Sequence, residues 1–356
     1  MSLGGPVRGP YKCGPQSPPA KPTGSLVSQS ELHSIVVPMY NEESVAEEFI
    51  RRATAAFAAL PDYEIIVVDD GSRDRTFEIV SAIAASDRHV KVVRFARNFG
   101  HQTATTAGID LAAGDTVSVI DADLQDPPEL IPQMVQLWRD GADIVFAVRE
   151  SRAGESAFKK ATASAYYRAL RRSARVDIPV DTADFRLMSR KAAEGLKAMR
   201  ERSRYMRGLV GWMGLNRAEI KYNRDARFAG ETKYPLRKMI RLAADGIVSF
   251  STIPLHIATF MGVCAAGLAF VYALYAVMMK ITGNYVVPGW ASIMVSVLFV
   301  GGVQLITLGV VGEYIGRIYD EVRARPLYLV SDVRGFDAPT AEHFAGSPLP
   351  KTDRTL

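Results

Sequence analysis

Short apolar runs alternate with amphipathic stretches over residues 34–148. The apolar runs predict strands over 34–38, 64–68, 90–95, 116–120 and 143–148. The amphipathic stretches between them predict helices over 43–60, 76–85, 102–113 and 129–140, and further helices are expected near 157–172 and 190–199. Strands that alternate with helices at this spacing indicate βαβ units. The predicted fold class is therefore α/β, with a mostly parallel sheet that binds ligands at the carboxyl ends of its strands.

Two long apolar runs follow this α/β pattern. Residues 253–279 and 286–312 each contain 27 residues without Asp, Glu, Lys or Arg. About 20 apolar residues are enough for a helix to cross the hydrocarbon core of a bilayer. The alternative, two buried helices of a soluble domain, is disfavoured because such helices rarely run this long without a charge. We expect transmembrane helices over 253–279 and 286–315, and hence an integral membrane protein.

The segments that flank these runs predict the orientation of the chain. Residues 1–30 contain six Pro, five Gly and five Ser, which predicts a disordered leader without the apolar stretch of a signal peptide. Residues 234–252 place Arg237, Lys238 and Arg241 among apolar residues, which predicts an interfacial amphipathic helix, with an ordinary surface helix as the alternative. The connection 280–285 carries one charge, whereas three arginines follow the second run. By the positive-inside rule, the domain over 31–233, the tail over 316–356 and both termini are cytoplasmic, and the connection is external.

Composition excludes several classes of function. The net charge is +5, a mild excess of 43 basic over 38 acidic residues. Cys13 and Cys264 are the two cysteines, too few for a disulfide framework or a thiolate metal site. The five histidines show neither metal-ligand spacing nor the order of a Ser/His/Asp hydrolase. Basic and aromatic residues do not interleave as in nucleic-acid-binding surfaces, so no nucleic-acid partner is expected.

Carboxylates gather after three of the predicted strands. Asp121-Ala-Asp-Leu-Gln-Asp126 follows the strand over 116–120, and Asp121 and Asp123 are close enough to repel each other unless a cation lies between them. Their oxygens suit Mg²⁺ or Mn²⁺, completed by the phosphates of a nucleotide. A polar turn before the next helix is the alternative. The first strand ends in Val37-Pro-Met-Tyr-Asn-Glu-Glu43 and the second in Val67-Val-Asp-Asp-Gly-Ser72, so all three turns lie at one edge of the sheet.

These three turns together resemble the motifs of the inverting glycosyltransferase family 2, which has the GT-A fold. More narrowly, residues 34–330 resemble the polyprenyl-phosphate glycosyltransferase group, which includes bactoprenol glucosyltransferases and dolichol-phosphate mannose synthase. The resemblance implies transfer of a hexose from a nucleotide diphosphate sugar to a polyprenyl phosphate. It also implies a membrane-bound, metal-dependent enzyme of the bacterial inner membrane that modifies a cell-envelope glycan such as lipopolysaccharide.

The resemblance also implies roles for the residues of the three turns. The residues expected around the nucleotide sugar are Pro38, Tyr40, Glu42, Asp69, Asp70 and Asp121, with Asp69 as the reader of the base and Asp70 supporting it. The expected ligands of the Mg²⁺ or Mn²⁺ ion are Asp121, Asp123 and Gln125. The segment Asp184-Phe-Arg186 matches a further block of the family, and the expected catalytic residues are Asp123, Asp184 and Arg186. Asp184 is expected to orient the acceptor phosphate or to accept a residual proton.

Basic residues are expected where the acceptor phosphate binds. The candidates are Arg149, Lys159, Lys160, Arg202 and Arg204. The segment Arg227-Phe-Ala-Gly-Glu-Thr-Lys233 resembles the family's mobile loop over the donor, so Arg227 and Lys233 are expected at the diphosphate. The block Arg97-Asn-Phe-Gly100 precedes His101, for which positioning and catalysis both remain open.

The sequence leaves the sugar and the nucleotide open. UDP-glucose is the preferred donor because of its frequency in the family, and undecaprenyl phosphate is the preferred acceptor. Glycines in both apolar runs favour helix packing, either within the chain or in a homo-oligomer such as a tetramer. Leu327-Tyr-Leu-Val330 is a candidate strand that would pair with a neighbour. The alternatives are a non-catalytic membrane scaffold and, less favoured with only two spans, a processive polysaccharide synthase.

Overall fold

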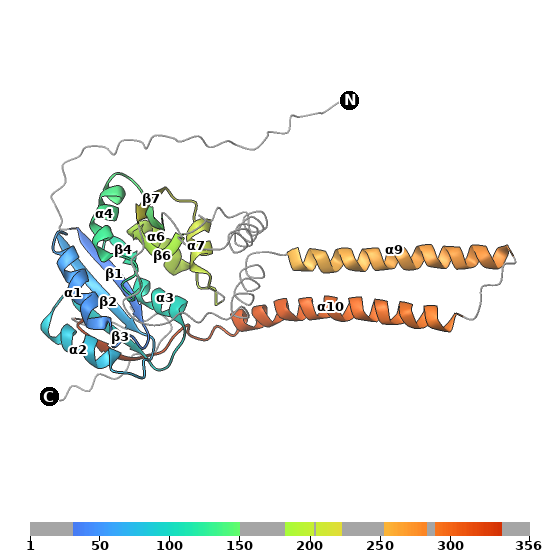
Figure 1. The fold of residues 1–356 in the computed structure, drawn as a ribbon, viewed down its shortest axis with the longest axis horizontal. Helices are drawn as coiled ribbons and strands as arrows, with labels where there is room; N and C mark the ends of the chain where they lie inside the picture. The colour runs from blue at the N-terminus through green and yellow to red at the C-terminus, as the bar shows by residue number, and fades with distance from the viewer. Residues whose placement is uncertain (1–30, 150–181, 203, 223–252, 283–288, 337–356) are drawn as a thin grey trace, which may run out of the picture.

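The computed structural model describes residues 31–149, 182–202, 204–222, 253–282 and 289–336. Over these ranges the chain forms an α/β domain from which two long helices project side by side (Figure 1). Four predicted segments lie wholly or partly outside the described residues: the leader, the helix near 157–172, the amphipathic helix over 234–252, and residues 283–285 of the external connection.

A mixed sheet lies at the centre of the α/β domain. Its eight strands in the described residues are β1 Leu32–Met39, β2 Asp62–Asp69, β3 Val90–Phe95, β4 Thr116–Val119, β5 Ile144–Arg149, β6 Thr182–Ser189, β7 Arg217–Tyr222 and β8 Val330–Arg334. The order across the sheet is β7-β5-β6-β4-β1-β2-β3-β8. Four neighbouring pairs are parallel and three, all involving β6 or β8, are antiparallel. The prediction of an α/β fold with a mostly parallel sheet is confirmed.

Helices cover both faces of this sheet. The helices beside the sheet are α1 Ala46–Phe57, α2 Thr76–Ser86, α3 His101–Leu111, α4 Ile131–Arg139 with the short 3₁₀ turn η1 Pro128–Leu130 before it, α6 Arg190–Ala198 and α7 Met206–Trp212. Apolar residues of α1, α2 and α4 pack on one face, and those of α3, α6 and α7 pack on the other. The central strands are buried on both faces, which explains why their sequences read as continuous apolar runs rather than as an alternation.

Three strands depart from the sequence pattern. No strand is predicted over β6 or β7, because β6 carries charged residues in its interior and β7 is a half-exposed strand at the edge of the sheet. The strand predicted over 327–330 begins instead at Val330, as β8. It pairs antiparallel with β3 of the same chain, with Val93 opposite Val333. The chain thus returns to its own sheet after the second long helix.

The two long helices are α9 Ile253–Ile281 and α10 Trp290–Val322. Both contain a stretch long and apolar enough to cross a membrane, over Ile257–Met279 and Val295–Val322. Large apolar side chains along them are exposed, as for Phe260 at 68% and Ile281 at 80%. A helix in the core of a soluble protein buries such side chains, so α9 and α10 are candidate membrane spans.

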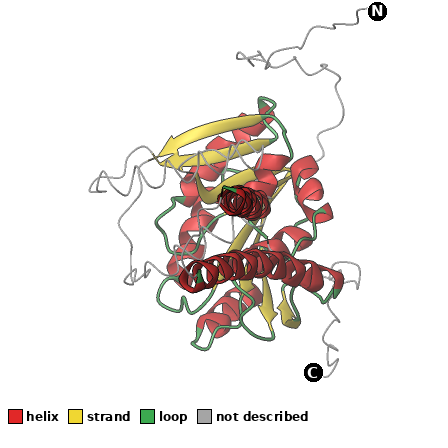
Figure 2. Ribbon diagram, turned by 90° about the vertical axis from the view of Figure 1, so that its right-hand side faces the viewer, coloured by secondary structure: helices red, strands yellow, loops and turns green. Residues whose placement is uncertain are grey.

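The end of α10 lies beyond the predicted end of the second span at residue 315. The helix continues to Val322 through a more polar stretch, in which Arg317 forms an ion pair of 3.0 Å with Glu313 one turn before it. Hydropathy marks the apolar part of a helix, not its last turn. Figure 2 views the pair from its far end toward the domain and shows both helices directed away from the sheet.

Candidate active site

A polar cleft lies at the carboxyl ends of β1, β2 and β4. Its volume is about 660 Å³. The residues that line it are Pro38, Met39, Tyr40, Glu42, Asp70, Asn98, Gly100, His101, Ala104, Asp121, Ala122, Asp123 and Asp184. The cleft therefore brings together residues from all three carboxylate-rich turns, as the sequence predicts for an α/β sheet, and adds Asp184 from β6.

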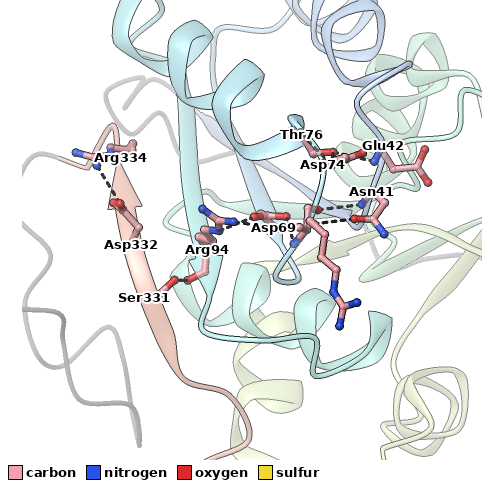
Figure 3. A network of polar contacts seen from close by, with 11 residues as sticks. Asn41, Glu42, Asp69, Asp74, Thr76, Arg94, Ser331, Asp332 and Arg334 are labelled. Carbon is pink, nitrogen blue, oxygen red and sulfur yellow. Dashed lines mark hydrogen bonds and ion pairs between the residues drawn. The ribbon is translucent and has the colours of Figure 1, made fainter.

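The turn after β1 is fixed by hydrogen bonds to the turn after β2 (Figure 3). The backbone N–H of Asn41 donates to Ser72 Oγ at 2.9 Å, and that of Glu42 donates to Thr76 Oγ1 at 2.8 Å. The amide oxygen of Asn41 accepts from the backbone N–H of Arg73 at 2.9 Å. Because both turns are held in one unit, Tyr40 and Glu42 keep a defined place at the cleft.

The two aspartates that end β2 have different environments. Asp69 is fully buried, accepts from the backbone N–H of Ser72 at 3.0 Å, and lies 3.3 Å from Arg94. Asp70 lines the cleft, and its two oxygens accept from the backbone N–H groups of Phe99 and Gly100 at 2.6 and 2.9 Å. Burial raises the pKa of both carboxyls. Asp70 therefore lines the cleft and Asp69 does not, and the role of Asp69 as the reader of the base stays a prediction.

Asp121 and Asp123 line the cleft after β4, whereas Gln125 is buried and is not part of its wall. Oδ1 of Asp121 is buried and has no hydrogen-bond partner among the described residues. Burial raises the pKa of Asp121 to about 6, an effect opposed by His101 and reinforced by Asp184.

A divalent ion fits this pair of carboxylates. The described residues contain no group of three or more His, Cys, Asp and Glu side chains placed to enclose a metal. An ion held by Asp121 and Asp123 alone would keep coordination positions for oxygens of a bound molecule, as Mg²⁺ does at phosphates. The observation that supports such an ion is Oδ1 of Asp121, which is buried, accepts no hydrogen bond within the described residues, and lies 3.6 Å from His101 Nε2.

Asp184 of β6 is held by two arginines. Its Oδ1 accepts from Arg207 Nε at 3.1 Å and lies 3.5 Å from Arg186 Nη2. Burial alone would raise the pKa of Asp184, but Arg207 and Arg186 lower it to about 2. Arg186 is only 1% exposed and is not part of the wall of the cleft. Its contact with the lining of the cleft is therefore its ion pair with Asp184.

His101 lies between carboxylates of two strands. Its Nε2 is 3.6 Å from Asp121 Oδ1 and 3.9 Å from Asp184 Oδ2, and the side chain is 41% exposed. It begins α3 directly after Gly100, whose φ of +101° suits glycine. The block over 97–100 marks this place in the sequence, but its bridging position depends on β6, which the hydropathy pattern does not reveal.

The residues predicted to bind the acceptor phosphate lie in different parts of the structure. Arg202 donates its backbone N–H to Glu321 Oε2 at 3.1 Å and its guanidinium to the Arg325 carbonyl, at the end of α10. Arg204 donates to the Leu196 carbonyl at 3.4 Å, and neither arginine lines the cleft. Arg149 is the last residue of β5. The other two acceptor candidates, Lys159 and Lys160, lie outside the described residues, as do Arg227 and Lys233, which are predicted at the donor diphosphate.

Comparisons with known proteins agree with this architecture. Residues 34–196 match the model of glycosyl transferase family 2, and residues 253–318 match the GtrB C-terminal hairpin. The chain is 47% identical to the uncharacterized glycosyltransferase YkcC of Bacillus subtilis, over 87% of this chain and 97% of that protein.

Two further relatives have names that state an activity. The prophage bactoprenol glucosyl transferase homolog of Escherichia coli is 42% identical over 85% of this chain and 99% of that protein. The bactoprenol glucosyl transferase of Shigella phage SfII is 42% identical over 83% of this chain and 96% of its own. The chain therefore belongs to glycosyltransferase family 2, in the group of GT-A enzymes that carry the GtrB-type C-terminal hairpin.

Proposed function

We propose that the protein transfers glucose from UDP-glucose to a polyprenyl phosphate, undecaprenyl phosphate in a bacterium, at the cytoplasmic face of the membrane. The observation that carries this proposal is the cleft itself, in which Asp121 and Asp123 lie beside Asp184 and His101. The identity to bactoprenol glucosyl transferases over nearly their full length supports the choice of sugar and acceptor.

The donor is proposed to bind across the turns after β1, β2 and β4. Asp70 and the turn over Tyr40 and Glu42 would hold the nucleoside, and the diphosphate would lie at Asp121 and Asp123. These two carboxylates would hold Mg²⁺ or Mn²⁺, which would supply positive charge to stabilise the leaving diphosphate. Two carboxylates without such an ion would repel a diphosphate, so the donor and the metal are expected to bind together.

The reaction is proposed to be a single displacement with inversion. An oxygen of the acceptor phosphate attacks the anomeric carbon, the bond from that carbon to the β-phosphate oxygen breaks, and the nucleoside diphosphate leaves. A phosphate monoester has a second pKa of about 6 and is largely ionised near neutrality, so it does not need a strong base. Asp184, with a pKa of about 2, is a weak base, and its proposed role is to orient Arg207 toward the acceptor phosphate.

The long helices suit an acceptor with a hydrocarbon tail. Such a lipid stays in the bilayer, and an enzyme anchored there by α9 and α10 meets it by diffusion in two dimensions. We place the α/β domain on the cytoplasmic side, because Arg317, Arg323 and Arg325 follow the apolar part of α10.

A panel of labelled donors tests the proposal. The full-length protein in detergent is incubated with undecaprenyl phosphate, with Mg²⁺, Mn²⁺ or EDTA, and with radiolabelled UDP-glucose, UDP-galactose, UDP-N-acetylglucosamine or GDP-mannose. We expect label in the organic phase from UDP-glucose, and none with EDTA. Label from a different sugar alone would correct the donor, and equal label with EDTA would exclude the metal.

A further inference from the structure

Tyr328 lies in the segment that links α10 to β8. Its side chain does not belong to any of the three turns of the cleft. It is only 2% exposed and packs in the core on the face of the sheet that α3 covers. It does not line the cleft. Tyr328 contacts both ends of residues 95–111, a continuous segment that includes α3 and is here called the α3 unit.

The ring of Tyr328 contacts the beginning of the α3 unit. It stacks on Phe95 with ring centroids 5.1 Å apart and an angle of 16° between the planes. Phe95 in turn meets Phe99 edge to face at 5.6 Å. The backbone N–H of Ala96 donates to the carbonyl of Leu329, the next residue after Tyr328, at 2.9 Å.

The hydroxyl of Tyr328 contacts the other end of the α3 unit. It donates to Asp110 Oδ2 at 3.0 Å, and Arg200 Nη1 donates to the same oxygen at 2.8 Å. Burial raises the pKa of Tyr328, so the hydroxyl stays protonated and remains a donor. One side chain therefore holds the α3 unit at its first residue and near its last.

Between these two contacts the α3 unit forms one wall of the cleft. Asn98, Gly100, His101 and Ala104 all line it. The backbone N–H groups of Phe99 and Gly100 fix Asp70, and His101 lies within 4 Å of both Asp121 and Asp184. A shift of the α3 unit would therefore move a wall of the cleft relative to its carboxylates.

The strand that follows Tyr328 supports the neighbouring wall. Ser331 Oγ donates to the Arg94 carbonyl at 3.2 Å, and Arg94 is paired with Asp69 and donates to the Ser72 carbonyl (Figure 3). Ser72 Oγ accepts from Asn41 in the turn after β1. The segment that follows α10 thus supports two walls of the cleft, the α3 unit through Tyr328 and the turns after β1 and β2 through Ser331.

We propose that Tyr328 is a positioning residue for the donor site, which holds the α3 unit so that Asn98 and His101 face the carboxylates of the cleft. In this proposal the segment after α10 does not line the cleft itself. It supports the residues of the α/β domain that do. The nature of the ligand, a nucleoside diphosphate, rests on the proposed function.

Three variants of the full-length protein in detergent test this role. Tyr328→Leu removes both contacts, and Tyr328→Phe keeps the stacking while it removes the hydroxyl. Phe57→Leu is the matched control, because Phe57 is fully buried at the end of α1 in the core on the other face of the sheet. Each variant is measured for its melting temperature, for UDP binding with Mn²⁺ by calorimetry, and for hydrogen exchange of residues 95–111.

We expect Tyr328→Leu to weaken UDP binding about tenfold, since a displacement of about 1 Å in a site can cost up to about a hundredfold. Tyr328→Phe should lose about threefold, a partial rescue. Exchange should rise over 95–111 in both Tyr328 variants. Phe57→Leu should lower the melting temperature by a similar amount and change neither UDP binding nor exchange over 95–111.

Equal UDP binding in Tyr328→Leu and Phe57→Leu, with no selective rise of exchange over 95–111, would overturn the proposal. If Tyr328→Leu does not fold, Tyr328→Phe decides by the same two readouts. Transfer to undecaprenyl phosphate by the unaltered protein is measured alongside. Its absence would remove the proposed function, whereas the exchange over 95–111 would still decide the role of Tyr328.

Discussion

Asp121 and Asp184 line the same cleft, but their surroundings move their pKa values in opposite directions. Burial raises that of Asp121 to about 6, whereas Arg207 and Arg186 overcome burial and lower that of Asp184 to about 2. Pairs of acids that are separated in this way commonly have different tasks. Asp121 is suited to hold a cation, and Asp184 is suited to hold two arginines in place.

Substitution of Asp184 is expected to affect both stability and activity. Asp184→Asn would leave Arg186 as a buried charge without its carboxylate, and removal of one partner of a buried pair typically costs about 3–5 kcal/mol. We expect a lower melting temperature and a kcat reduced by about a hundredfold through misplacement of Arg207. An Asp332→Asn variant, which removes a more exposed ion pair on β8, serves as the control. An Asp184→Asn enzyme with normal kcat would refute the positioning of Arg207.

The contribution of Asp184 to stability should also depend on pH. Its folded-state pKa of about 2 lies below the unfolded value of about 3.9, so the unfolded chain binds a proton first as the pH falls. The stabilisation is complete above about pH 5 and is lost between about pH 4 and pH 2. The difference in melting temperature between the unaltered protein and Asp184→Asn should therefore be constant from pH 8 to about pH 5 and shrink below about pH 4. A difference that shrinks already near pH 6 would contradict the assignment.

Metal binding provides a residue-scale test that does not depend on turnover. With UDP present, Asp121→Asn and Asp123→Asn should each weaken Mn²⁺ binding by at least about tenfold, because each removes a proposed oxygen ligand. Titration followed by the electron paramagnetic resonance of free Mn²⁺ measures this, with Asp332→Asn as the control. Unchanged Mn²⁺ affinity in both variants would place the metal elsewhere.

At the scale of the elements, Gly71 in the turn after β2 occupies a position where a side chain would be strained and would clash. Its φ is +70°, and a Cβ at this position would lie 2.6 Å from the backbone carbon of Arg97. The turn after β2 therefore packs directly against the loop that leads to His101. The close approach of these two backbones joins two walls of the cleft.

Gly71→Ala should therefore damage the cleft as well as the backbone. Gly141 is the matched control, because it also has a positive φ, +108°, but a Cβ there would meet nothing within 4 Å. Gly141→Ala is expected to cost about 1 kcal/mol from strain alone. Gly71→Ala should lower the melting temperature further and weaken UDP binding, measured by thermal unfolding and calorimetry. Equal effects of the two substitutions would show that the contact with Arg97 is unimportant.

The elements also show where a single sequence is informative. Strands β1 to β5 are predictable because they are buried apolar runs between turns, and the turns at their carboxyl ends place Tyr40, Asp70 and Asp123 in one cleft. β6 is not predictable from hydropathy, because Asp184 and Arg186 interrupt it, and their charges are balanced by each other and by Arg207 and His101 from other elements. Asp69 and Asp70 are both buried, but only Asp70 lines the cleft. This difference depends on contacts with Arg94 and residues 99–100, which two adjacent aspartates in a sequence do not reveal.

At the scale of the whole molecule, α9 and α10 leave the α/β domain and the chain returns to the same sheet at β8. Both ends of the hairpin therefore belong on the side of the membrane where the domain lies. The arginines after the apolar part of α10 favour the cytoplasmic side. This orientation is a proposal, as is the assembly of the hairpins into an oligomer.

Cysteine labelling in intact cells tests the orientation. Single cysteines are introduced as Asn284→Cys, in the connection between the long helices, and as Asp332→Cys, in a background with Cys13→Ser and Cys264→Ser. A membrane-impermeant maleimide should label position 284 in intact cells and position 332 only after the cells are opened. The reverse pattern would place the domain outside.

The most direct test of the account is the transfer of labelled glucose by two proteins that differ in one carboxylate oxygen. The unaltered protein and Asp123→Asn, each in lipid nanodiscs with undecaprenyl phosphate, UDP-[¹⁴C]glucose and Mn²⁺, are compared by label extracted into organic solvent. We predict that the unaltered protein forms a glucosyl-phosphoryl lipid that mass spectrometry identifies, and that Asp123→Asn, folded to the same melting temperature, forms at most about a hundredth as much. Equal transfer by both, or none by either while UDP binding is intact, would contradict the account.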